Sequence, residues 1–169
     1  MKIKLLLAVA VFLSLNFGSN IPTQATAQPK PPKQTDLNKI LFKHQQLARL
    51  PKVIAYLETR AHKTAYVFSG DKPTGWDCSG LVKYAYKQLG VILPHSADAQ
   101  GHIGHRVSEP IAGDIVVFAY KGRTDFYHSA IYLGNNLIIN ANRNYGTTVI
   151  EPLSNFSKAE IRFIRILSK

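Results

Sequence analysis

The chain has little cysteine: among its 169 residues only Cys78 carries a thiol, which excludes an intramolecular disulfide. Acidic residues are also scarce, with 10 Asp and Glu against 21 Lys and Arg, and the formal net charge is +11. A basic surface favours polyanions in general. The sequence shows no zinc-finger, RNP-like or helix-turn-helix signature, however, and its basic residues are scattered, so we expect no nucleic-acid partner.

Long hydrophobic runs are missing too. The one apolar run, at residues 5–15, is well short of the ~20 residues that span a bilayer as a helix, so we expect no transmembrane anchor. Lys2 and Lys4 precede this run, and small residues follow it at 25–27. This order is typical of an export signal, and we expect residues 1–27 to be a signal peptide that is cleaved after Ala27.

The rest of the chain has the length of one domain. Residues 28–35 (QPKPPKQT) are rich in Pro and Lys and predict an extended spacer. Residues 36–169 are expected to form a single monomeric domain, delivered to the periplasm or secreted to the extracellular side. An anionic cell-envelope surface is the simplest partner for such a basic exported chain.

Hydrophobic periodicity predicts helices first and strands afterwards. Residues 36–50 and 52–62 have helical spacing and are divided by Pro51. Residues 78–89 give the strongest helical stripe, with Gly90 at the position of a C-terminal cap. After a loop at 93–113 the period changes to two and predicts strands at 115–120, 128–133, 137–141, 147–151 and 161–167. This order favours an α+β fold with helices packed on one side of an antiparallel sheet.

Cys78 is the candidate nucleophile. A lone thiol in an oxidising compartment is a liability unless its reactivity is used, and Asp77 and Ser79 beside it are not typical neighbours of a core cysteine. Because Cys78 begins a predicted helix, the helix macrodipole favours its anion. A nearby imidazole would take the proton, whereas the negative charge of Asp77 opposes ionisation. The pattern predicts a thiol of lowered pKa.

Among six histidines, His128 is the best placed to act as the base, because it opens a predicted strand that can aim its ring. If residues 134–136 form a three-residue hairpin loop, Leu133 pairs with Leu137 and Ala130 pairs with Asn140. His128 then lies diagonal to Asn140 on the same face, within side-chain reach. An Asn carbonyl that accepts from one imidazole nitrogen would fix which nitrogen faces the thiol.

Three segments, at 77–82 (DCSGLV), 113–118 (GDIVVF) and 128–134 (HSAIYLG), resemble in order and spacing the motifs of the NlpC/P60 cysteine peptidases. These are bacterial cell-wall hydrolases with a papain-like α+β fold, and the resemblance covers roughly residues 65–151. It implies that Cys78 is the nucleophile, His128 the base and Asn140 the third polar residue, where the family often has a second His.

The same resemblance implies roles for four further residues. Tyr66 lies twelve residues before Cys78, where the family carries a Tyr whose hydroxyl completes the oxyanion hole with the Cys78 N–H. Asp77 and Ser79 resemble a pair that contacts the amino end of the substrate in some members. His95 stands near the expected substrate groove where the family usually has Arg. No cofactor or metal is implied.

The implied reaction is hydrolysis of a peptidoglycan stem-peptide amide, most often between γ-D-Glu and the diamino acid. Three alternatives remain open from the sequence. The same Cys-His site could serve an N-acetylmuramoyl-L-alanine amidase or a crossbridge peptidase. A metal site could be built on His95, His102 and His105, since zinc sites commonly use three protein ligands. The chain could also be a non-catalytic wall-binding domain.

Overall fold

The computed structural model describes residues 33–167, and the chain from Lys33 onward forms one compact unit. The expected signal peptide at 1–27 and most of the expected spacer at 28–35 lie outside the described residues. Helix α1 begins at Gln34, inside the last part of that spacer. Within residues 33–167, no helix has the length and apolar character needed to cross a membrane.

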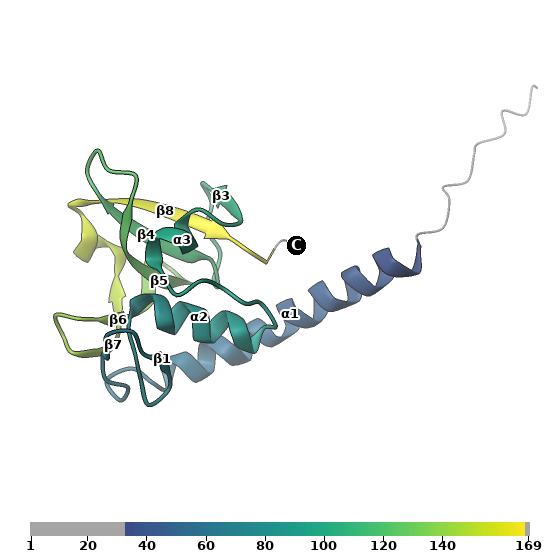
Figure 1. Cartoon of the computed structure of the whole chain (residues 1–169), viewed down its shortest axis with the longest axis horizontal. Helices are drawn as coiled ribbons and strands as arrows, with labels where there is room; N and C mark the ends of the chain where they lie inside the picture. Colours follow the sequence, from purple (N-terminus) through teal and green to yellow (C-terminus); the bar gives the residue numbers. More distant parts are fainter. Residues whose placement is uncertain (1–32, 168–169) are drawn as a thin grey trace, which may run out of the picture. The chain divides into compact units, whose positions relative to one another are not determined.

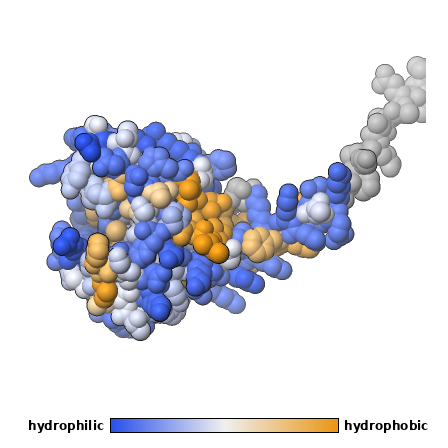
Figure 2. All heavy atoms as spheres, viewed as in Figure 1, coloured by the Kyte–Doolittle hydropathy of each residue, from blue (hydrophilic) through white to orange (hydrophobic). Residues whose placement is uncertain are grey.

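Helix α1 (Gln34–Glu58) runs without interruption through Pro51, so the expected division at this proline is wrong. Pro51 is exposed, and it removes one hydrogen bond of the helix without ending it. Helix α1 packs on the body chiefly through its second half, where Val53 and Leu57 are buried, while its N-terminal turns extend away (Figure 1). Figure 2 shows hydrophobic residues gathered where α1 meets the body, on an otherwise largely hydrophilic face.

The segment after α1 leads directly to the best-predicted helix. A short hairpin of β1 (Asp71–Lys72) and β2 (Gly75–Trp76) precedes it. Helix α2 (Cys78–Gln88) follows at once and buries its predicted apolar stripe. The expected loop at 93–113 contains two short elements that the sequence did not indicate, α3 (Ala97–Gly101) and β3 (His105–Val107).

All five predicted strands are present and form one antiparallel sheet with β3, in the order β3-β8-β4-β5-β6-β7. Their bounds are β4 (Ile115–Tyr120), β5 (Phe126–Gly134), β6 (Leu137–Asn142), β7 (Thr147–Pro152) and β8 (Ala159–Arg165), with a 3-10 helix η1 (Leu153–Phe156) between the last two. Helices α1 and α2 cover one face of the sheet, as expected (Figure 1). A smaller cluster around Val116, Phe118 and Leu153 covers part of the other face. The fold is α+β.

The hairpin between β5 and β6 sets the geometry of the candidate site. Ile131 pairs with Ile139, which is the register expected for the body of the hairpin. The expected pairing of Leu133 with Leu137 is wrong, because the register shifts and Leu137 pairs with Gly134. Asn135 and Asn136 both have positive φ, as two-residue hairpin turns require. The irregularity at the turn therefore leaves the register near His128 as predicted.

Candidate active site

Cys78 is the first residue of α2, and its position is fixed by the preceding Asp77. One Asp77 carboxylate oxygen accepts from the Gly80 N–H at 2.7 Å and from the Ser79 hydroxyl at 3.1 Å. The other accepts from the Ser69 N–H at 2.9 Å. Asp77 thus caps the helix and ties it to the preceding turn, a role that favours a helix start at this point. The thiol of Cys78 is partly buried at the opening of a pocket.

Burial raises the pKa of the Cys78 thiol above its ordinary value, and the charge of Asp77 raises it further. Backbone N–H groups, including that of Ser129 on β5, oppose the rise without reversing it. The prediction of a lowered Cys78 pKa is therefore wrong. Loss of hydration outweighs the favourable placement at the helix start. In the free chain the thiol is protonated at neutral pH.

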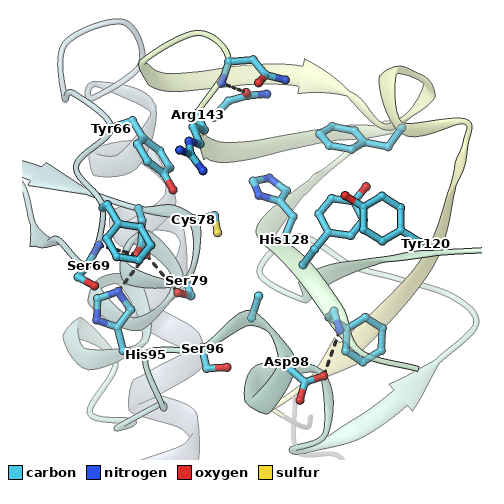
Figure 3. Close-up of a pocket in the computed structure, with 18 residues that line it drawn as sticks. Tyr66, Ser69, Cys78, Ser79, His95, Ser96, Asp98, Tyr120, His128 and Arg143 are labelled. Atoms are coloured by element: carbon cyan, nitrogen blue, oxygen red, sulfur yellow. Dashed lines mark hydrogen bonds and ion pairs between the residues drawn. The ribbon is translucent and has the colours of Figure 1, made fainter. Parts of the chain in front are cut away.

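His128 projects from β5 toward the thiol (Figure 3). Its Nε2 atom lies 3.0 Å from Oδ1 of Asn140 on β6, which is the contact predicted from the strand register. The ring stacks on Phe156 at 5.7 Å between centroids. Burial lowers the pKa of His128 to about 4, although the Asn140 hydrogen bond acts in the opposite direction. The imidazole is therefore neutral at neutral pH, and Cys78 and His128, which line the same pocket, are a pair of neutral groups.

Tyr66 lies on the opposite side of the thiol, with its hydroxyl directed toward Cys78 (Figure 3). The backbone holds it there, because the Tyr66 N–H donates to the Gly146 carbonyl at 2.9 Å. Burial raises the pKa of the Tyr66 hydroxyl, and the nearby Cys78 and Asp77 groups raise it further. The hydroxyl thus remains a proton donor beside the thiol.

The remaining sequence-predicted residues lie together on one wall of the pocket. His95 Nε2 is 2.9 Å from the Asp77 carboxylate, and Ser79 bonds to the same carboxylate oxygen. The structure therefore brings Asp77, Ser79 and His95 beside Cys78. The other two histidines of the proposed metal site do not join them: His102 bonds to the backbone of Asp98, and His105 lies on β3. Across residues 33–167, no three His, Cys, Asp or Glu side chains form a metal-binding group.

A buried glutamine connects the helix that carries Cys78 to the strand that carries His128. Gln100 of α3 has no exposed surface. Its Nε2 atom donates to the backbone carbonyls of Ser79 at 2.9 Å and Pro94 at 2.8 Å, and its Oε1 atom accepts from the Ser129 hydroxyl at 2.9 Å. Ser79 follows Cys78 and Ser129 follows His128, so this side chain links the two segments that carry Cys78 and His128.

The pocket over Cys78 has a volume of about 700 Å³. Sequence reasoning missed several of its lining residues, among them Arg143, Asp98, Tyr120, Tyr127 and Phe156. Tyr120 and Tyr127 stack at 4.5 Å between ring centroids on the His128 side. Arg143 lies beside Tyr66 (Figure 3). These residues come from two short helices, a loop and two strand ends that carry no motif of their own. Only the strand alternation at Tyr120 offered a signal. The pocket combines a thiol, an imidazole and a tyrosine hydroxyl, which is the equipment for acyl transfer through a covalent intermediate.

Comparison with known proteins identifies the family of the chain. A model of the NlpC/P60 family matches residues 63–165, so the chain belongs to the NlpC/P60 family. The chain is 38% identical over 104 residues to the γ-DL-glutamyl hydrolase of Bacillus subtilis, a match that covers 59% of this chain and 25% of that protein. It is 42% identical over 82 residues to the probable endopeptidase p60 of Listeria innocua, a match that covers 47% of this chain and 17% of that protein.

Solved structures show the same fold. The peptidoglycan hydrolase RipB of Mycobacterium tuberculosis superposes with a TM-score of 0.59 at 25% identity, over 72% of this chain and 68% of that one. NlpC2 of Trichomonas vaginalis gives a TM-score of 0.62 at 25% identity, over 69% of this chain and 46% of that one. The matched region amounts to a quarter or less of the length of the curated relatives named above.

Proposed function

We propose that this chain is a cysteine peptidase that hydrolyses stem-peptide amide bonds of bacterial peptidoglycan. The observation that carries the proposal is the placement of Cys78, at the start of α2, in one pocket with His128 and Tyr66, where the buried Asn140 bonds to the His128 ring from behind. The bond we assign to it lies between γ-D-Glu and the diamino acid. The match to a γ-DL-glutamyl hydrolase supports this γ-linked specificity.

The reaction starts from the neutral pair. As Cys78 Sγ attacks the amide carbonyl carbon, His128 takes the thiol proton, so charge separates only when the C–S bond forms. The Tyr66 hydroxyl and the Cys78 backbone N–H donate to the oxyanion. The C–N bond then breaks as His128 protonates the leaving amine. Water that loses a proton to His128 hydrolyses the thioester, and the released proton restores the thiol.

Substrate binding is assigned to the wall formed by Asp77, Ser79 and His95. The Asp77 carboxylate is the acidic group of this wall and lies next to the thiol, so it would attract the amino end of a stem peptide. The leaving half of the substrate then lies on the side of His128, along the stacked rings of Tyr120 and Tyr127.

The cellular setting is proposed on the sequence. Residues 1–27 would direct export and be removed, 28–35 would act as a spacer, and 36–169 would work as a monomeric domain in the periplasm or outside the cell. The formal net charge is +11 for all 169 residues and +9 without residues 1–27, which contain Lys2 and Lys4 and no acid; this charge would hold the protein near anionic envelope polymers. Recovery of the exported protein with Met1 still present would contradict the signal assignment.

Mass spectrometry of defined peptidoglycan fragments tests the function. Fragments incubated with the exported chain should give products ending in γ-D-Glu, and the Cys78→Ala variant should fold and give none. A thiol alkylator should abolish cleavage while a chelator has no effect. Cleavage by Cys78→Ala would refute the mechanism. A Cys78-dependent cut at the glycan–peptide link or in a crossbridge would refute the assigned bond, and no cut at all would favour a binding role.

A further inference from the structure

Glu151 of β7 is a nearly buried carboxylate that no motif singled out, with 6% of its surface exposed. Its Oε1 atom accepts from the side-chain amides of Asn140 and Asn142, both at 2.9 Å. Its Oε2 atom accepts from the side-chain amide of Asn155, also at 2.9 Å. These donors are all neutral amides. Burying a carboxylate without a cationic partner is costly, so its place directly behind Asn140 calls for an explanation.

A carboxylate only accepts hydrogen bonds, and this fixes the orientation of Asn140. Asn140 has no exposed surface, so its amide cannot turn toward water. If the amide flipped, its Oδ1 atom would face Glu151 Oε1, and two acceptors would meet at hydrogen-bond distance. The Nδ2 atom of Asn140 therefore points to Glu151, and its Oδ1 atom points to His128.

The orientation of Asn140 in turn fixes the proton on His128. Because Asn140 Oδ1 accepts, the His128 Nε2 atom 3.0 Å away must carry a hydrogen. In a neutral imidazole only one nitrogen is protonated, so Nδ1 is left as the acceptor on a ring that faces Cys78 (Figure 3). The hydrogen bonds thus run in one direction, from His128 to Asn140 to Glu151.

We propose that Glu151 is a positioning residue that holds His128 in the Nε2-protonated tautomer by orienting Asn140. Its catalytic consequence rests on the proposed function, since Nδ1 must be free to take the Cys78 proton. The tautomer itself can be measured whether or not the chain cleaves peptidoglycan.

The test replaces Glu151 with Gln, which has nearly the same shape but a donor on one arm. Either arm can then face Asn140, so Asn140 can present either Oδ1 or Nδ2 to His128. Nitrogen-15 NMR of the full chain labelled at histidine, with the His128 signals assigned by a His128→Gln variant, reports the tautomer. We expect one Nε2-protonated species in the wild type and a mixture in Glu151→Gln. On the cleaved substrate, kcat should fall in proportion to the Nδ1-protonated fraction, about twofold for an even mixture, with little change in KM.

Asn155→Ala is the matched control. It removes a donor from the same carboxylate but leaves the Asn140–Glu151 bond in place, so the melting temperature should fall while tautomer and kcat stay unchanged. A single tautomer in Glu151→Gln, even with lost activity, would overturn the proposal in favour of a structural role. If that variant fails to fold, the wild-type spectrum still decides, because an Nδ1-protonated His128 contradicts the inference. A tautomer shift in a chain that cleaves nothing would instead refute only the proposed function.

Discussion

Lowering the pH should destabilise this protein through His128. The pKa of this imidazole falls from about 6.5 in an unfolded chain to about 4 in the folded one, chiefly because of burial. Between these values the unfolded state binds a proton that the folded state does not, so stability is lost as the pH falls. At 1.36 kcal/mol per pKa unit the full effect is at most about 3 kcal/mol, and about 2 kcal/mol should be lost between about pH 7 and pH 5.

Urea unfolding of the wild type and of His128→Gln at these two pH values isolates the effect. Glutamine cannot titrate and can still donate to Asn140 Oδ1, so the variant lacks this part of the pH dependence while the other histidines contribute equally to both proteins. The wild type should lose about 2 kcal/mol more than the variant over this interval. Equal losses would show that burial does not lower the pKa of His128 in the folded chain, which would contradict this prediction.

Three further predictions concern the same site. Ultraviolet titration should show no thiolate at neutral pH in the free protein, because burial raises the pKa of Cys78; thiolate absorbance at pH 7 would indicate a preformed ion pair. Tyr66→Phe should lower kcat by about 100-fold, as loss of one oxyanion donor does, whereas Tyr132→Phe, outside the pocket lining, should change it little; equal kcat values would remove Tyr66 from the oxyanion hole. Gln100→Ala leaves two carbonyls and a hydroxyl without their partner, and urea unfolding should show a loss of about 3 kcal/mol or more; a loss below about 1 kcal/mol would mean that water replaces the amide.

The contact between His128 and Asn140 was predictable because strand alternation and hairpin pairing are local rules. The contact is present although the turn was predicted wrongly. The register shift falls between Tyr132 and Gly134, next to the turn, and leaves the pairing of Ile131 with Ile139 unchanged. The helix start at Cys78 was predictable for a similar reason, because the capping Asp77 is adjacent in sequence.

Features that depend on contacts between residues far apart in the sequence could not be predicted from these local rules. Gln100 and Glu151 act through hydrogen bonds to residues on other elements, and nothing near them in sequence marks that role. The pKa of Cys78 was mispredicted because local reasoning includes the helix macrodipole but not the loss of hydration that packing imposes. Pro51 was misread because a proline inside a helix removes one hydrogen bond but does not have to end the helix.

Trapping the acyl-enzyme tests the central claim most directly. Cys78 is the only cysteine in the chain, so a thioester can form at one position only. Peptidoglycan fragments mixed with the protein and quenched rapidly in acid should add the mass of the acyl half of the substrate to the peptide that contains Cys78. The adduct should be absent from Cys78→Ala. Cleavage of the substrate by a protein that never carries this adduct, even at the shortest times, would contradict covalent catalysis by Cys78.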